Sequence, residues 1–350
     1  MSHHSLRRSS TTDSLAGHTP DRLSRILPLD TSYRSSQVFS WIHRGAASFD
    51  EMTNIPKTLR TTLAGTGIPM YSSRVTGTQA DPQDGSVKFT LELSDGAVIE
   101  SVLLSDGKGR KTACLSSQAG CAMGCTFCRT AAMGLKRSLS PSEIAEQFMH
   151  IRKMAADTSH IVFMGMGEPL ANLESVKQAV EVFHHPESYA MSHRRMTIST
   201  CGIPSGIRSL AREGPPVRLA LSLITAREPL RESLMPAAGK FPLKEIKEAL
   251  ADHQARHRQR ITLEYVLLKG INDTPEDIKA LARFASGLQV LVNLIPWNPA
   301  AELPFTEPAK NDTAAFAKRI MNAGLNCVTR YGKGRGINGA CGQLAAQSAR

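Results

Sequence analysis

Apolar residues recur at two different periods along the chain, and these periods predict the secondary structure. From Thr112 onward, short runs rich in Val, Ile and Leu alternate with stretches in which apolar residues lie three or four positions apart. The short runs are typical of strands buried in a parallel sheet, and the stretches between them are typical of amphipathic helices. The predicted strands cover residues 113–116, 160–164, 195–199, 217–223, 262–268, 290–295 and 326–331.

The clearest helix start lies at Ser140. This serine precedes Pro141, and Glu143 follows three positions after the serine, which is the pattern of a capping box with proline at the first helical position. Further helices are predicted over residues 173–183, 243–256 and 275–285. A strand followed by a helix, repeated about six times, predicts an α/β fold whose parallel sheet forms a partial (β/α)6 barrel. The carboxyl ends of its strands are then the expected place for an active site.

The chain before this barrel divides into three predicted parts. Residues 1–20 are rich in Ser and Thr and lack the apolar core of a secretory signal, so we expect a disordered tail and a cytoplasmic protein. Residues 21–68 are expected to form a small basic helical domain. Residues 69–106 show alternating apolar positions around an Asp-Gly turn, which predicts a β-hairpin or meander that links this domain to the barrel of residues 107–346.

The charge balance favours a polyanionic partner. The formal net charge is +11, from 42 Lys and Arg against 31 Asp and Glu, and such a surplus attracts nucleic acid. Aromatic residues make up only 5% of the chain, so binding through charge and shape is favoured over base stacking on an aromatic platform. No apolar run approaches the ~18 residues of a membrane span, so we expect no membrane partner.

Four of the seven cysteines lie within one short segment, at Cys114, Cys121, Cys125 and Cys128. In a reducing compartment, clustered thiols bind metals or carry out chemistry rather than staple the fold. Three thiolates spaced four and three positions apart can surround one side of a 4Fe–4S cluster and leave its fourth iron open. The alternative is a structural zinc site in which Cys114 supplies the fourth ligand.

Glycines and polar residues follow several of the predicted strands. Gly167 and Glu168 come after the strand at 160–164, where glycine lets the backbone approach a ligand and the carboxylate offers an acceptor to an ammonium group. Three further strand ends place polar side chains or exposed backbone where the barrel mouth is expected. These are Ser199, the segment Ser222-Leu223-Ile224, and Asn298.

The segment from Tyr331 to Leu344 has glycine at alternate positions and then a lone cysteine, Cys341. So much glycine predicts a mobile loop, which lets one sulfur occupy two positions. Cys114 is a second thiol outside the triplet, and two such thiols beside a metal site indicate a covalent relay. The alternative is a flexible basic tail with an incidental cysteine.

The cysteine triplet, placed just after the first strand of a βα repeat, resembles the radical S-adenosylmethionine superfamily. A narrower resemblance, to the RlmN/Cfr family of RNA adenosine methyltransferases, covers residues 21–346. It rests on the segments Cys114-Leu-Ser-Ser-Gln-Ala-Gly-Cys121, Phe163-Met-Gly-Met-Gly-Glu-Pro-Leu-Ala-Asn172, Val292-Asn-Leu-Ile-Pro-Trp-Asn-Pro299 and Ala340-Cys-Gly-Gln-Leu344. The fold it implies is a partial radical SAM barrel with an amino-terminal helical accessory domain.

The resemblance also implies cofactors and ligands. Cys121, Cys125 and Cys128 would hold a 4Fe–4S cluster, whose open iron binds the methionine moiety of S-adenosylmethionine and whose electron cleaves it to a 5′-deoxyadenosyl radical. The residues that would bind S-adenosylmethionine are Gly167, Glu168, Ser199, Ser222, Leu223, Ile224 and Asn298. An electron donor such as flavodoxin or ferredoxin would be a partner, and we expect a monomer.

The implied reaction is methylation of an adenosine ring carbon in 23S rRNA and in tRNA, with carbon 2 favoured over carbon 8. Both carbons are electrophilic, so they do not attack a methylsulfonium and a radical route is needed. Cys341 would become S-methylcysteine and carry the carbon to the RNA. Glu100 would accept the ring proton, and Cys114 would release the adduct by forming a disulfide with Cys341.

The chain departs from the family pattern at two places. Residues 334–339 read Gly-Arg-Gly-Ile-Asn-Gly, where the family usually has Gly-Asp-Asp-Ile-Asp-Ala. Ile224 stands where His or Asn is usual. Two other functions stay open at this point: a radical enzyme of the same superfamily that acts on a protein or small molecule, and a metal-binding RNA adaptor without catalysis.

Overall fold

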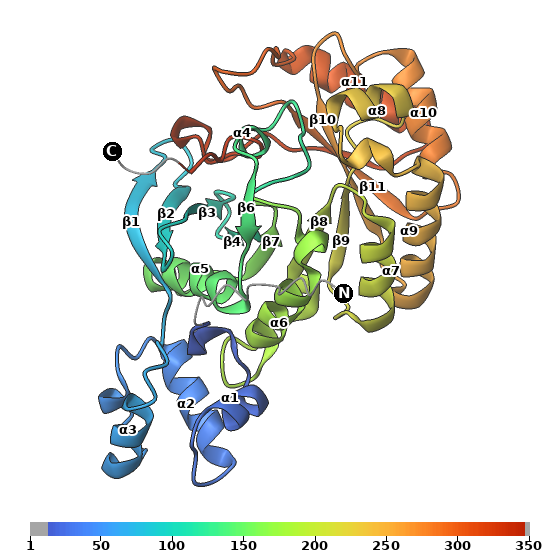
Figure 1. Cartoon of the computed structure of the whole chain (residues 1–350). Coiled ribbons are helices and arrows are strands. Elements are labelled where there is room, and N and C mark those ends of the chain that lie inside the picture. Colours follow the sequence, from blue (N-terminus) through green and yellow to red (C-terminus); the bar gives the residue numbers. More distant parts are fainter. Residues whose placement is uncertain (1–12, 347–350) are drawn as a thin grey trace, which may run out of the picture.

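One sheet of ten strands forms the centre of the computed structural model, which describes residues 13–346 (Figure 1). Its strands are connected in a single line from β1 to β12, and within the described residues these two edges do not pair, so the barrel is partial as predicted. The parallel strands are β4 (Lys111–Cys114), β7 (His160–Phe163), β8 (Met196–Thr200), β9 (Arg218–Ser222), β10 (Ile261–Leu267), β11 (Val290–Pro296) and β12 (Cys327–Thr329).

Helices lie between successive parallel strands and cover the outside of the sheet (Figure 1). They are α5 (Pro141–Met154), α6 (Leu173–His184), α7 (Pro204–Glu213), α8 (Glu228–Leu234), α9 (Leu243–His257), α10 (Pro275–Ala285) and α11 (Lys310–Asn322). Each strand and helix that the periodicity predicts is present, with small shifts at the ends. The apolar periods identify these elements because the strands are buried on both faces and the helices on one.

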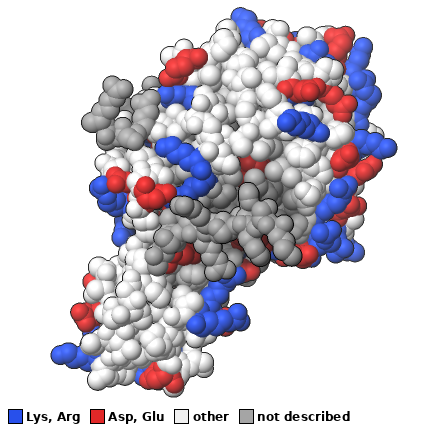
Figure 2. All heavy atoms as spheres, viewed as in Figure 1, with Lys and Arg blue, Asp and Glu red and all other residues white. Residues whose placement is uncertain are grey.

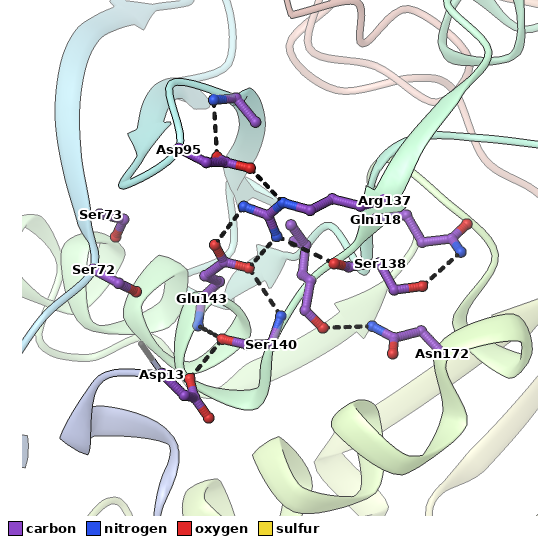
Figure 3. A network of polar contacts seen from close by, with 12 residues as sticks. Asp13, Ser72, Ser73, Asp95, Gln118, Arg137, Ser138, Ser140, Glu143 and Asn172 are labelled. Carbon is purple, nitrogen blue, oxygen red and sulfur yellow. Dashed lines mark hydrogen bonds and ion pairs between the residues drawn. The ribbon is translucent and has the colours of Figure 1, made fainter. Parts of the chain in front are cut away.

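The capping box predicted at Ser140 is confirmed. The Glu143 backbone N–H donates to Ser140 Oγ (3.2 Å), and the Ser140 N–H donates to the Glu143 carboxylate (2.9 Å). The same carboxylate accepts two hydrogen bonds of 2.7 Å from Arg137, on β6 (Leu135–Ser138), which pairs with β5 (Gln118–Gly120). Arg137 also reaches Asp95 at 2.6 Å, so one guanidinium joins the start of α5 to the turn of the β-meander (Figure 3).

The meander belongs to the main sheet. Its strands are β1 (Ser73–Ala80), β2 (Val87–Leu93) and β3 (Val98–Ser105), and β3 pairs antiparallel with β4, with Val102 opposite Cys114. The predicted link is therefore a three-stranded extension of the barrel, and it carries Glu100 on the strand next to Cys114.

The amino-terminal helices form a small lobe below α5 and α6 (Figure 1). They are α1 (Pro20–Ile26), α2 (Tyr33–Arg44) and α3 (Lys57–Ala64). Part of the predicted disordered tail is ordered: residues 13–20 contain a 3-10 turn at Leu15–Gly17 and the start of α1. The prediction was wrong there because Leu15 is fully buried, an anchor that Ser/Thr-rich composition does not reveal. Residues 1–12 lie outside the described part of the chain.

A buried carboxylate ties this lobe to the barrel. Glu146 on α5 is 1% exposed, and it accepts hydrogen bonds from the Ser14 hydroxyl (2.6 Å), the Ser72 N–H (2.8 Å) and the Ser73 N–H (2.7 Å). Burial raises the pKa of Glu146, while these donors lower it. The contacts join three segments that are far apart in sequence.

Basic and acidic side chains are interspersed on the face shown in Figure 2, where Lys and Arg do not merge into one continuous patch. None of the helices within residues 13–346 is long and apolar enough to cross a membrane.

Replacing Glu146 by alanine should lower the free energy of unfolding by about 3 kcal/mol, because buried donors at Ser14, Ser72 and Ser73 would lose their acceptor. Urea denaturation followed by circular dichroism measures the change. The control is Glu174→Ala, whose carboxylate is 71% exposed beside Lys177 and should cost no more than about 0.5 kcal/mol. Equal losses in the two variants would contradict the anchoring role.

Candidate functional site

The cysteine triplet lies on the loop between β5 and α4 (Arg129–Ala132). Its backbone is fixed on two sides: the Cys121 N–H donates to Gly134 O (3.0 Å), and the Thr126 N–H donates to Leu234 O at the end of α8 (2.9 Å). Burial raises the pKa of Cys121 to about 11. Burial also raises the pKa of Cys125, to which the charges of Cys128 and Cys121 add. The three thiols therefore lie near one another in a place that water reaches poorly.

The turn after β7 packs directly against the segment that leads to the triplet. Gly167 has φ +98°, and a Cβ there would lie 2.7 Å from the Gln118 backbone nitrogen, so only glycine fits. Glu168 is buried, and its two oxygens accept the N–H groups of Leu170 (2.9 Å) and Cys201 (2.8 Å). Each carboxylate oxygen keeps a second lone pair, and the role of Glu168 toward an ammonium group stays a prediction.

The ends of β8 and β9 bring three of the predicted residues together. Ser199 Oγ and Ser222 Oγ are 3.2 Å apart. The N–H groups of Leu223 and Ile224 both donate to the carbonyl of Glu264 at 3.1 Å. Ile224 has φ +64°. Asparagine adopts this conformation at low cost, whereas a β-branched residue such as isoleucine is strained in it. The departure noted in the sequence therefore places a strained residue at the end of β9.

Two polar residues on β10 and β11 escaped the sequence analysis. Glu264 and Asn293 face each other in register, and Asn293 Nδ2 donates to Glu264 Oε2 at 2.5 Å. Burial raises the pKa of Glu264 to about 7, and Asn293 Oδ1 is buried without a partner within the described residues. The sequence did carry a signal for these residues: a carboxylate and an amide stand inside two otherwise apolar strands. Such groups are buried only where they are paired with each other or bind a ligand.

Cys341 lies beside this pair. Asn298 Nδ2 donates to the Cys341 carbonyl at 3.0 Å, and Asn298 Oδ1 is a buried acceptor with no partner in residues 13–346. Although residue Cys341 is exposed, its thiol is surrounded by protein atoms: burial raises its pKa to about 12, and the charges of Cys128, Glu264 and Cys114 raise it further. The fold thus brings the carboxyl-terminal thiol to both the triplet and Cys114.

Glu100 contacts the segment that carries Cys341. Its carboxylate is 5% exposed, forms an ion pair with Lys88 (3.1 Å) and accepts the Ala345 N–H (2.9 Å), four residues after Cys341. Cys114 ends β4 and is buried, and burial raises its pKa to about 12. The loop that separates Glu100 from Cys114 in the sequence is closed by pairing of β3 with β4.

All seven cysteines are free thiols. The disulfide between Cys114 and Cys341 that the resemblance implies is therefore absent from this state of the protein. Cys114 is buried and Cys341 is exposed, and the raised pKa of each thiol keeps it protonated and slow to oxidise.

Comparison with known proteins decides the family. Residues 115–285 match the radical SAM superfamily, and residues 30–67 match the ribosomal RNA large subunit methyltransferase N-terminal domain. The chain is 43% identical over 336 residues to the probable dual-specificity RNA methyltransferase RlmN of Treponema denticola, covering 96% of each chain. The corresponding Thermus thermophilus protein is 40% identical over 339 residues, with 94% of each chain covered. The chain belongs to the RlmN family of radical SAM RNA methyltransferases.

A solved relative supports the fold of this RlmN family member over its whole length. The crystal structure of a radical SAM methyltransferase from Sphaerobacter thermophilus is 37% identical, superimposes with a TM-score of 0.90, and covers 96% of this chain and 100% of that chain. The resemblance to the RlmN/Cfr family is confirmed, as are the radical SAM barrel and the enzyme class.

Membership of the RlmN family implies a 4Fe–4S cluster and S-adenosylmethionine. The spacing of the cysteine triplet fits such a cluster. No three His, Cys, Asp or Glu side chains within residues 13–346 lie close enough to bind a single metal ion. A 4Fe–4S cluster needs thiolates that lie farther apart than the ligands of a single ion, because each thiolate binds a different iron. The spacing therefore favours the cluster over the zinc alternative that needed Cys114, and Cys121, Cys125 and Cys128 are the residues that would hold it.

The stability of this RlmN family member should fall with rising pH because of Glu264. Its folded pKa of about 7 lies above the ordinary value of 4.5, so its contribution is complete below pH 4.5 and is lost as the pH rises through 7. Glu264→Gln keeps the neutral form, so its free energy of unfolding relative to the native protein should rise by about 2 kcal/mol between pH 5 and pH 8. Urea denaturation at both pH values measures this, and a constant difference would refute it.

Anaerobically purified protein should be brown, absorb near ~400 nm and contain about four iron atoms per chain. Cys125→Ser should remove the colour and the iron, because only two thiolates would remain. Cys327→Ala, on β12 away from the triplet, is the matched control and should keep both. A colourless wild-type protein that contains zinc would disprove the cluster assignment.

Proposed function

We propose that the chain methylates carbon 2 of an adenosine in 23S rRNA, with tRNA as a second substrate, through S-methylcysteine at Cys341. The observation that carries this proposal is the return of the Cys341 segment to the barrel: Asn298 Nδ2 donates to the Cys341 carbonyl, the Arg129 N–H next to Cys128 donates to Gly342 O, and the Ala345 N–H donates to Glu100. Two free thiols beside a cluster site are what a covalent relay needs. The family model for large-subunit ribosomal RNA methyltransferases, and relatives described as dual-specificity RNA methyltransferases, support RNA as the substrate.

When bound, the cluster and S-adenosylmethionine supply a methyl group and a 5′-deoxyadenosyl radical, which suits an electrophilic ring carbon. A one-electron donor of the flavodoxin or ferredoxin type completes the system. The residues proposed to bind S-adenosylmethionine are Gly167, Glu168, Ser199, Ser222, Leu223, Ile224 and Asn298. The unpartnered oxygen of Asn298 supports this set, because a buried acceptor gains from a donor supplied by a ligand.

The chain's own residues then act in sequence. Cys341 Sγ takes a methyl group as its thiol proton is lost, and loss of a hydrogen atom from that methyl gives the carbon radical that adds to adenine. Glu100, held by Lys88 and by the Ala345 N–H, takes the proton from the ring carbon, and the one unpaired electron that the adduct then carries would return to the cluster. Cys114, as its thiolate, finally attacks Cys341 Sγ: the S–S bond forms, the S–C bond breaks, and the carbon keeps that electron pair and takes up a proton to become the product methyl.

The two thiols should fail at different steps. Cys341→Ala should abolish methylation of the protein and leave no covalent intermediate. Cys114→Ala should still become methylated at Cys341 and attack RNA, so a covalent protein–RNA species should accumulate on denaturing gels. Cys327→Ala is the matched control and should turn over normally. A Cys114→Ala protein that turns over and traps no RNA would disprove the relay.

The substrate is tested by mass spectrometry of nucleosides from ribosomal and transfer RNA, with and without the gene. We expect 2-methyladenosine to disappear from the RNA of the deletion strain and to return with the wild-type gene, whereas Cys341→Ala should not restore it. A change confined to 8-methyladenosine would overturn the choice of carbon. No change in any methyladenosine would overturn RNA as the substrate.

A further inference from the structure

Two carboxylates of the β1–β2 turn hold the loop that precedes Cys341. The Gly334 N–H donates to Asp84 Oδ2 at 2.8 Å, and the Gly336 N–H donates to Asp81 Oδ2 at 3.0 Å. The donors and acceptors are some 250 residues apart in the sequence. We call Asp81 and Asp84 the carboxylate latch.

The latch is built into its turn. Asp81 is 3% exposed, and its other oxygen accepts the Gln83 N–H at 2.9 Å. Asp84 accepts the Ser86 N–H at 2.8 Å. Burial raises the pKa of Asp84, but the hydrogen bonds from Ser86 and Gly334 and the charge of Lys333 outweigh it and bring the pKa below its usual value. Asp84 therefore stays ionised at neutral pH and makes charge-assisted hydrogen bonds, which are the stronger kind.

The loop is matched to the latch. Gly334 has φ +67°, and a Cβ on Gly336 would lie 3.2 Å from Asp81 Oδ2, so both positions favour glycine. Arg335, between the two glycines, pairs with Glu307 at 2.7 Å. Arg335 and Gly336 stand where the family usually has aspartate, whereas Gly334 matches the family glycine. A carboxylate at position 336 would lie beside Asp81 and be repelled by it, whereas the Gly336 N–H donates to Asp81.

The far end of the loop is held differently. Beyond Cys341, the Arg129 N–H donates to Gly342 O (2.9 Å) and the Thr130 hydroxyl donates to Leu344 O (2.7 Å). These contacts fix the segment after the thiol to the helix that follows the cysteine triplet. The thiol thus lies between an attachment to the barrel and a turn of glycines that, among residues 13–346, is held by the latch and by the Arg335–Glu307 pair.

We propose that Asp81 and Asp84 are positioning residues that hold the loop in the arrangement in which Cys341 accepts its methyl group. The inference rests on the proposed function. A transfer between two sulfurs requires the acceptor within contact distance and in line, and a displacement of about 1 Å can cost 10²-fold in rate.

The experiment uses the reconstituted holoenzyme with S-adenosylmethionine and without RNA, and follows the mass of the Cys341 peptide with time. The double variant Asp81→Ala/Asp84→Ala should gain the methyl group at least about tenfold more slowly than the wild type, because the loop loses its attachment. Asp81→Asn/Asp84→Asn should lose less rate than the alanine pair, because each amide keeps one oxygen that can accept the loop N–H, although its nitrogen replaces the oxygen that accepted the N–H of the turn. The melting temperature of the alanine pair should fall, because Asp81 is buried and its donors lose their acceptor, so the rates are compared at a temperature at which both variants remain folded. The affinity of both variants for ribosomal RNA should match the wild type.

The matched control is Asp106→Ala, which removes an aspartate whose carboxylate accepts N–H groups only from its own turn, at Lys108 and Arg110. It should methylate Cys341 at the wild-type rate. Alanine variants that methylate Cys341 as fast as the wild type would overturn the latch, and so would equal losses in the alanine and asparagine pairs accompanied by lower melting temperatures. If the wild type itself never gains a methyl group at Cys341, the proposed function fails and not the latch alone.

Discussion

The return of the carboxyl-terminal segment across the barrel mouth is the constraint on which the site depends. Hydrogen bonds from Asn298 to the Cys341 carbonyl and from the Ala345 N–H to Glu100 join the last strand region, the terminal thiol and the meander. Without this return Cys341, the proposed methyl acceptor, would lie away from the barrel mouth. In each contact a side chain of the barrel or the meander binds a backbone group of the carboxyl-terminal segment. The path of that segment therefore depends little on its own side chains.

Several buried polar groups lie where the chemistry is expected. Glu168, Glu264 and Asn293 are each less than 9% exposed, and each is held by hydrogen bonds from neighbouring strands or turns. A buried polar group destabilises the fold unless it is hydrogen-bonded. Asn293 Oδ1 and Asn298 Oδ1 have no donor among the described residues, so a ligand that donates to them would bind favourably. The same low-polarity setting keeps the thiols protonated until a cluster or a partner sulfur draws them into reaction.

Rigid and adjustable contacts are separated along the chain. The loop of the cysteine triplet, residues 121–128, is held by a hydrogen bond to the end of α8 and by Trp297, whose indole N–H donates to the Phe127 carbonyl at 3.1 Å. The glycine-rich loop before Cys341 is pinned by carboxylates that belong to the meander, a part of the sheet outside the βα repeat. The proposed relay fits this division, because it asks one thiol to act with two partners beside a fixed cluster.

The sequence by itself determined the elements and the chemistry that are local in the chain: the strand and helix periods, the capping box at Ser140, and the cysteine triplet with the glycine turn at Gly167. These follow from neighbouring residues, and so does the family resemblance. Only the tertiary structure decided that Leu15 anchors the predicted tail, that Glu264 and Asn293 face each other, and that Asp81 and Asp84 hold the loop of Cys341. Such pairs join residues that are distant in the sequence, and no local period records which strand or turn will lie opposite a given side chain.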